Sequence, residues 1–360
     1  MRVAFVSAVT SHHRDTPQAE RVRRTAELLA ARGHEVVVFC GRWWDGSLDE
    51  FEHDDVTYRA VTPDATGWRF LTRLPGRLRE FDPDVVHAVH HPPGHVVAAW
   101  VGGVLASAPV VVDWYDTKPR EEPGGAVRRH LRRKARRLAT RLPATIVTPS
   151  ATVKTGVREL GAADEDVRVV PNPVEMDRIR EATVNGTADV VFSRHLDEDA
   201  NLESLLLSLA EFRDREWTTV VVGDGPERES YERQARDLRI QDQVEFVGDQ
   251  DLDDLLPVLR GAHVYVHTAT RTSFATDLLR GLASGCVGIV QYHAESSAHE
   301  LVERRERGFL VTDETELKQA LVEAGEMERR DLDEAFAEFD EREYLERVLD
   351  CYRDAMGETA

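Results

Sequence analysis

The stretch VYVHTATRTSFATDLLRGLASGCVGIV, residues 264–290, decides the fold of this chain. It begins with an apolar run over 264–266, which is typical of a buried strand. A polar turn follows, then a helical pattern over 277–283, then Gly285 and a second apolar run. In a parallel α/β sheet, a unit of this kind presents a helix N-terminus to an anionic ligand.

Strand-like runs alternate with helical patterns along the whole chain, and this alternation favours a parallel α/β architecture. In the first half we expect strands at 3–7, 35–40, 56–60, 85–88, 110–113, 145–148 and 167–170, and helices at 19–32, 67–80, 127–142 and 151–160. In the second half we expect strands at 190–192, 218–222, 244–247, 264–267 and 287–290, and helices at 202–213, 227–238, 251–259 and 277–283. The tail over 332–356 reads as one amphipathic helix.

Composition sets limits on the class of protein. A chain of 360 residues is long enough for two domains. Its formal net charge of −20 argues against general nucleic-acid binding, which requires a basic face. The surplus of acidic residues, with only four lysines, indicates a protein kept soluble in concentrated salt, as in the cytosol of a halophile. No leader precedes the first strand and no apolar run is long enough for a membrane span, so we expect a cytoplasmic protein.

The opening stretch resembles the donor-binding signature of retaining GT-B glycosyltransferases of family 4, E-x-F-G followed after four residues by L-E-A-x-A-x-G-x-P-V-V. Seven residues are in register: Phe274, Leu279, Ala283, Ser284, Gly285, Val287 and Val290. Thr272 and Arg280 stand where the family has its two glutamates. The connector VVPNPVEMDRI, residues 169–179, resembles the family's P-N-G-V-D hinge.

The resemblance implies two Rossmann-like domains that face a cleft. Residues 1–173 would bind the acceptor and residues 174–340 the nucleotide sugar, while a terminal helix at 341–360 would cross back to the first domain. The donor would be a UDP- or GDP-hexose. We expect no further cofactor and no metal ion, because the chain has no suitably placed D-x-D, and His12 and His13 are unaccompanied.

Donor-binding residues are expected at several strand ends of the second half. Gly223 and Gly225 form a tight turn between a strand and a helix. The loop that follows Val247 would lie at the carboxyl edge of the sheet, where backbone groups can bind a nucleobase. Arg194 takes the place of the arginine that holds the diphosphate. The backbone of the turn before the helix at 277–283 would hold a phosphate. The donor-side residues of this segment are Thr272, Ser273, Phe274, Ala275, Thr276, Asp277 and Arg280.

Catalytic residues are expected in the first half. VVHAVHHPPGH, residues 85–95, and VVVDWYDTKPRE, residues 110–121, resemble segments of relatives that act in surface-polysaccharide and lipid-linked sugar assembly. His90 or His91 would orient or deprotonate an acceptor hydroxyl. Asp116 would do the same, or would stabilise positive charge that develops at the sugar carbon.

A basic amphipathic segment, GGAVRRHLRRKARRLATRL at residues 124–142, stands out on this acidic chain. Such a helix is typical of docking to anionic lipid or to a lipid phosphate, although its apolar stripe could equally pack on the sheet. The expected membrane and acceptor surface comprises Arg128, Arg129, Arg132, Arg133, Lys134, Arg136, Arg137 and Trp68. Trp43 and Trp44 would join that surface or close an edge of the core.

Taken together, these features predict a retaining hexosyltransferase that moves sugar from a nucleotide donor to a lipid-linked or glycan acceptor, in surface-glycan or glycoprotein-glycan assembly. Two alternatives remain open. One is a GT-B-like binding or partner protein without transfer activity, suggested by Thr272, Arg280 and Asp199, the last at the place of a family lysine. The other is a nucleotide-sugar epimerase of the same fold.

Overall fold

The structure is a computed structural model that describes residues 1–360 except 15, 46–48, 64–66, 117–125, 185 and 358–360. For residues 126–129, 131 and 132 it describes the backbone but not the side chains. The chain divides into two compact units. The first unit comprises Met1–Pro171 and Arg342–Ala360, and the second comprises Asn172–Glu341.

The first unit is built on an eight-stranded sheet in the order β3-β4-β2-β1-β5-β6-β7-β8. All neighbours are parallel except β3, which pairs antiparallel with β4 at the edge. The strands are β1 (Arg2–Val6), β2 (Glu35–Gly41), β3 (Glu50–His53), β4 (Val56–Thr62), β5 (Val85–Val89), β6 (Val110–Asp113), β7 (Thr145–Thr148) and β8 (Val167–Val169).

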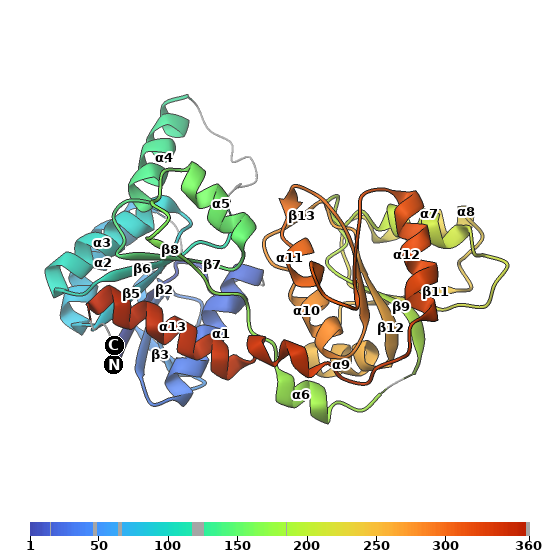
Figure 1. The fold of residues 1–360 in the computed structure, drawn as a ribbon. Helices are drawn as coiled ribbons and strands as arrows, with labels where there is room; N and C mark the ends of the chain where they lie inside the picture. The colour runs from blue at the N-terminus through green and yellow to red at the C-terminus, as the bar shows by residue number, and fades with distance from the viewer. Residues whose placement is uncertain (15, 46–48, 64–66, 117–125, 185, 358–360) are drawn as a thin grey trace. The chain divides into compact units, whose positions relative to one another are not determined.

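Helices cover both faces of this sheet, so its strands are apolar on both sides. The helices are α1 (Pro17–Ala31), α2 (Trp68–Phe81), α3 (Pro93–Ala106), α4 (Ala126–Ala139), α5 (Ala151–Glu159) and α13 (Glu341–Met356). Side chains of α2 and α3, such as Leu74 and Val96, share one core with the sheet. Side chains of α1 and α13, such as Leu29 and Tyr352, share the core on the opposite face (Figure 1).

The second unit is built on a six-stranded parallel sheet in the order β11-β10-β9-β12-β14-β16. Its strands are β9 (Ala188–Ser193), β10 (Thr219–Val222), β11 (Val244–Gly248), β12 (Ala262–His267), β14 (Val287–Gln291) and β16 (Gly308–Val311). Two short strands, β13 (Arg271–Thr272) and β15 (Glu295–Ser296), pair separately. This sheet is also covered on both faces, so the predicted architecture of two doubly wound α/β units is confirmed.

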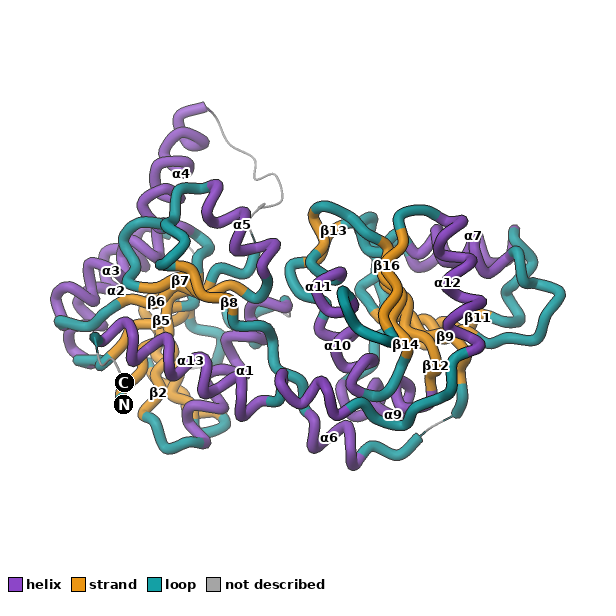
Figure 2. The backbone as a smooth tube through the Cα atoms, in the orientation of Figure 1, coloured by secondary structure: helices purple, strands orange, loops and turns teal. Residues whose placement is uncertain are grey.

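The helices of the second unit lie on the two sides of its sheet, as Figure 2 shows. On one side are α7 (Leu202–Ala210), α8 (Arg228–Asp237) and α12 (Glu314–Glu326). On the other are α6 (Met176–Glu181), α9 (Leu252–Gly261), α10 (Thr276–Ala283), α11 (His299–Val302) and a 3-10 helix at Glu334–Phe339. The backbone N–H of Val174 donates to the carbonyl of Phe339 at 2.8 Å, so the two ends of the unit lie next to each other.

The expectation of one helix over 332–356 is wrong. The 3-10 helix is capped by Asp333, whose carboxylate accepts from the N–H of Ala335, and the chain then turns extended at Asp340 before α13 begins. The physical reason is that the two segments serve different cores. Phe336 is buried in the second unit, whereas Tyr344 is buried in the first.

No helix in the described part of the chain combines the length and the apolar character needed to cross a membrane.

Candidate functional site

The carboxyl ends of β9, β12 and β13 bring three polar side chains together in the second unit. Arg194 follows β9, and its Nη1 donates to the hydroxyl of Thr272 at 2.9 Å. That hydroxyl lies 3.1 Å from Nε2 of His267, the last residue of β12. Because a guanidinium can only donate, the Thr272 hydroxyl accepts from Arg194 and gives its own hydrogen to His267. Burial, with a smaller effect of the Arg194 charge, lowers the pKa of His267 to about 3, so its ring is neutral and suited to accept.

Several polar atoms around these residues are buried and lack a protein partner within the described part of the chain: Arg194 Nε, His293 Nε2 and Ser296 Oγ. Ser296 pairs with Thr272 between the two short strands. Buried polar atoms without partners are costly, and a ligand oxygen is one group that satisfies them. Arg194 also forms an ion pair with Asp197 through Nη2, at 3.6 Å, so its Nε–H is the donor left for that purpose among the described residues.

The predicted glycine turn packs directly against the segment that carries Arg194. Gly223 has φ +126°, and a Cβ there would lie 2.0 Å from the carbonyl oxygen of Arg194. Gly225 has φ +157°, and its Cβ would lie 2.4 Å from the carbonyl oxygen of Leu196. Only glycine permits this approach. Val247 lies half-buried near the end of β11.

The turn before α10 is tied to the short strands. Ser297 donates from its hydroxyl to the carbonyl of Ser273 at 2.7 Å and from its backbone N–H to the carbonyl of Thr272 at 2.9 Å. Phe274 is half-buried and Ala275 is the N-cap residue of α10. Alanine has no side-chain oxygen with which to cap, so the first N–H groups of the helix suit an anionic ligand.

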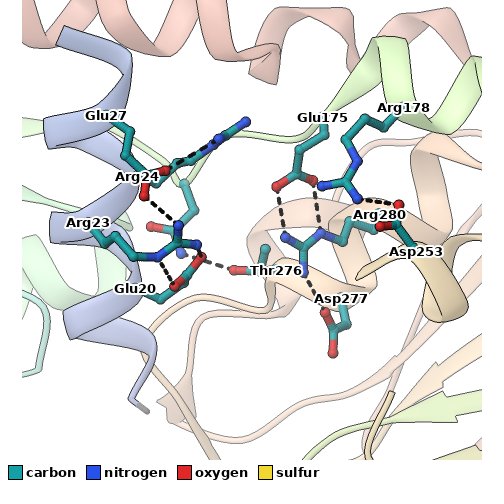
Figure 3. A network of polar contacts seen from close by, with 11 residues as sticks. Glu20, Arg23, Arg24, Glu27, Glu175, Arg178, Asp253, Thr276, Asp277 and Arg280 are labelled. Carbon is teal, nitrogen blue, oxygen red and sulfur yellow. Dashed lines mark hydrogen bonds and ion pairs between the residues drawn. The ribbon is translucent and has the colours of Figure 1, made fainter. Parts of the chain in front are cut away.

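Asp277 and Arg280, on the first turns of α10, are held in an internal network (Figure 3). Asp277 accepts from the Ser193 hydroxyl at 2.8 Å and from Arg280 at 3.0 Å. Arg280 also donates twice to Glu175, at 2.8 and 3.0 Å. Burial on its own would lower the pKa of Arg280, but the charge of Glu175 raises it well above its usual value. Arg280 is therefore already neutralised by protein carboxylates.

Sequence reasoning did not identify His267, His293, Ser296 or Glu175 as site residues. His267 carried a usable signal, because it is a polar residue at the end of an apolar strand. His293 lies in a short loop and Ser296 in the two-residue strand β15, and neither segment has a sequence pattern. Glu175 contacts Arg280 across 105 positions of sequence.

In the first unit, His90 and Asp116 follow the neighbouring strands β5 and β6. His90 is buried, and its Nδ1 accepts from the N–H of Tyr115 at 3.4 Å and pairs with Nε2 of Gln18 at 2.9 Å. Burial, aided by the charge of His91, lowers the pKa of His90 to about 3. With Nδ1 accepting, the ring proton sits on Nε2, so that nitrogen is a hydrogen-bond donor. His91 is exposed and Asp116 is half-buried.

The two tryptophans close an edge of the first unit's core. Trp44 is buried there, and Trp43 packs against the same cluster and stacks on His12 at 4.0 Å between ring centres. Within the ranges that the structure covers, no group of three or more His, Cys, Asp or Glu side chains is arranged to hold a metal ion.

Helices α2, α3 and α4 pack next to one another in the first unit and expose apolar and basic side chains. The side chains of Arg128, Arg129 and Arg132 lie outside the described residues. Arg133, Lys134 and Arg137 are exposed and Arg136 is half-buried. Apolar side chains are exposed on all three helices: Trp68, Val101, Val104, Leu105 and Leu138.

Comparisons with known proteins match both units. Residues 18–173 match the family model of the glycosyl transferase 4-like domain, and residues 175–339 match that of glycosyl transferases group 1. Among curated proteins, the alpha-monoglucosyldiacylglycerol synthase of Streptococcus pneumoniae is 24% identical over 210 residues. That alignment covers 52% of this chain and 47% of the synthase, so it spans about half of the relative's length.

Solved structures share the fold over nearly the whole chain. Anabaena Alr3699/HepE in complex with UDP superposes with a TM-score of 0.76 and 16% identity, covering 97% of this chain and 99% of that one. Sucrose-phosphate synthase from Thermosynechococcus elongatus superposes with a TM-score of 0.75 and 17% identity, covering 99% of this chain and 100% of that one.

Proposed function

The chain is a GT-B glycosyltransferase with a glycosyl transferases group 1 domain, and from this premise we propose that it is a retaining hexosyltransferase acting on a nucleotide-sugar donor and a lipid-linked or glycan acceptor. The observation that carries the donor assignment is the cluster at the ends of β9, β12 and β13. There a buried guanidinium N–H of Arg194 lies without a protein partner beside the uncapped start of α10.

The chemistry follows from where these groups stand. Transfer forms a bond between C1 of the hexose and the acceptor oxygen, and breaks the bond between C1 and the donor phosphate. The departing nucleoside diphosphate gains negative charge and takes up the acceptor proton. Arg194 and the backbone of residues 273–276 would stabilise that charge. In the first unit, His90 would orient the acceptor hydroxyl, and Asp116 would stabilise positive charge at C1.

Support for a lipid-linked acceptor comes from the exposed side chains of α2, α3 and α4. Val104 is 60% exposed, and basic side chains such as Arg133 and Arg137 accompany the exposed apolar ones. On a chain with a net charge of −20, such a local basic surface favours anionic lipid over most other partners. The protein would then act at the cytoplasmic face of a membrane.

The test of function is a transfer assay. The purified chain is incubated in molar salt with radiolabelled UDP- and GDP-hexoses and with membranes or polyprenyl-phosphate sugars as acceptors. We expect label from one donor to enter the lipid fraction, and the anomeric configuration of the product to match that of the donor. Absence of transfer together with absence of donor binding by calorimetry would favour the partner-protein alternative. A changed sugar that is still attached to its nucleotide would favour the epimerase.

The membrane contact is tested by sedimentation with vesicles that contain anionic lipid, and with zwitterionic vesicles as a comparison. Val104→Asp should reduce binding to anionic vesicles about ten-fold, because it places a charge in the apolar part of the surface. Val322→Asp is the matched control, since Val322 is an exposed apolar residue on α12 of the second unit. Equal binding of the two variants would contradict the membrane assignment.

A further inference from the structure

The segment that enters the second unit contacts α10 at two points. Nδ2 of Asn172 donates to the hydroxyl of Thr276 at 2.9 Å. One turn further along the helix, the two carboxylate oxygens of Glu175 accept from Nη2 and Nε of Arg280 at 2.8 and 3.0 Å. Figure 3 shows the Glu175 carboxylate opposite the Arg280 guanidinium, in a fork-to-fork arrangement. The entry segment is thus attached to the helix whose first turn belongs to the candidate donor site.

The Glu175–Arg280 pair is largely withdrawn from solvent, with side-chain exposures of 7% and 17%. A bidentate carboxylate–guanidinium pair fixes both distance and orientation. In such an environment, removal of one partner is far more disruptive than at an exposed site. The pair therefore constrains α10 more strongly than an ordinary surface ion pair does.

The network continues from Arg280 towards Arg194. Nη1 of Arg280 donates to Oδ1 of Asp277, and Oδ2 of Asp277 accepts from the Ser193 hydroxyl. Ser193 is the last residue of β9 and directly precedes Arg194. A continuous set of polar contacts thus runs from the entry segment, across the first turns of α10, to the strand end that carries the diphosphate arginine.

We infer that Glu175 and Arg280 are a positioning pair for the donor site, holding the first turn of α10 in register with Arg194. This inference rests on the proposed function, because it takes residues 273–276 and Arg194 to be the two anchors of the donor diphosphate. Two anchors that are fixed before binding cost less to engage than two that must be ordered by the ligand. Arg280 acts here through Glu175 and Asp277 and does not contact the donor.

The experiment is a double-mutant cycle with Glu175→Gln, Arg280→Gln and both together, in the full chain. Dissociation constants for the UDP- and GDP-hexoses of the transfer assay are measured by calorimetry at a temperature where each variant is folded. Hydrogen exchange is followed at the amides of residues 276–279. Each single change should weaken donor binding about ten-fold, and the double variant should be no weaker than the worse single one, since the pair acts as a unit.

The matched control is Asp253→Asn, which breaks the exposed pair that Arg178 forms beside Glu175. It should leave donor affinity and amide exchange at residues 276–279 unchanged. Glu175→Asp keeps the charge on a shorter side chain. It provides a folded test if Glu175→Gln does not fold, and should weaken binding less than the neutral change does.

Two results would overturn the inference. The first is a lowered melting temperature in Glu175→Gln with donor affinity within about two-fold of wild type, which would make the pair a stabilising contact only. The second is additive effects in the cycle. If the wild-type chain binds none of the nucleotide sugars, the proposed function fails separately. Exchange at residues 276–279 then decides: unchanged protection in Glu175→Gln would end the inference.

Discussion

Nε of Arg21 donates to Oδ2 of Asp113 at 2.8 Å, and both side chains are only 1% exposed. This pair joins α1 to the end of β6 in the middle of the first unit. Nη2 of Arg21 also donates to the carbonyl of Val170 at 2.9 Å, so one guanidinium connects a helix, a strand and the chain that leaves the unit. Near it, His87 pairs with the phenol of Tyr352 at 2.7 Å.

Replacement of Asp113 by Asn should destabilise the protein strongly. It removes the carboxylate that pairs with the buried Arg21, and the expected loss in the free energy of unfolding is about 3–5 kcal/mol. Urea unfolding measures it. Glu35→Gln, which breaks the exposed Arg2–Glu35 pair, serves as the control and should cost less than about 1 kcal/mol. Similar losses in the two variants would show that burial of the pair is unimportant.

Stability should fall in acid in two stages. Burial of the imidazole lowers the pKa of His95 to about 4, so the unfolded chain, with a histidine pKa of about 6.5, takes up that proton first. The contribution of His95 is therefore complete above about pH 6.5 and is lost as pH falls towards 4. Burial alone would raise the pKa of Asp113, but Arg21 and His87 outweigh it and lower the pKa to about 2. Its contribution is lost below the unfolded carboxyl pKa of about 3.9.

The first stage is testable with His95→Phe, because His95 stacks on Phe70 with ring centres 4.6 Å apart and a phenyl ring fits the same contact. Between pH 6.5 and pH 4, we expect the unfolding free energy of this variant to fall less than that of wild type. The difference between the two decreases should be about 3 kcal/mol at most. Urea denaturation at a series of pH values gives both curves. Parallel curves over this interval would refute the assignment to His95.

Gly223→Ala should damage the donor site through the backbone. The new Cβ would meet the carbonyl oxygen of Arg194 at 2.0 Å, in a left-handed conformation that alanine rarely adopts. We expect a destabilisation of about 1–3 kcal/mol and a weaker affinity for the nucleotide sugar, measured by thermal unfolding and calorimetry. Gly76→Ala on α2 is the control. Nothing lies within 4 Å of its Cβ, and helix propensity should make that change neutral or stabilising.

Thr272→Val should weaken donor binding about ten-fold, because it removes the oxygen that holds Nη1 of Arg194 and leaves that N–H and Nε2 of His267 without their partner. Thr272→Ser retains the hydroxyl and should bind nearly as well as wild type. Calorimetry with the donor identified by the transfer assay compares the two. If the valine and serine variants bind equally, the hydroxyl has no part in donor recognition.

The sequence was sufficient for most of the parallel strands, although it did not predict β16, and it was insufficient for the polar networks. The runs at 110–113 and 145–148 coincide with β6 and β7, because fully buried strands are apolar on both faces. β3 was not predicted, since all four of its residues are exposed and two of them are glutamates. The strand forms through backbone pairing with β4, and the pattern of its side chains does not indicate that pairing.

The candidate site was predictable to the same degree. Gly223 was named as a candidate from the local pattern of a tight turn, and Arg194 from the resemblance at a strand end. The close approach of Gly223 to Arg194 could not be predicted, because it depends on the pairing of strands β9 and β10 in the sheet. Arg280 was expected to face the donor, and only the fold shows that Glu175 lies opposite it.

Helix α13 belongs to the first unit although it follows the second unit in the sequence, and this has a consequence for synthesis. On the ribosome, all eight strands of the first unit emerge before the second unit does, but Tyr344 and Tyr352 emerge after it. Until then Thr25 and His87 lack their phenol partners, and the nascent sheet keeps one face partly uncovered. The first unit therefore reaches its final form only after the intervening unit has been translated, which makes its completion a late step in the biogenesis of the protein.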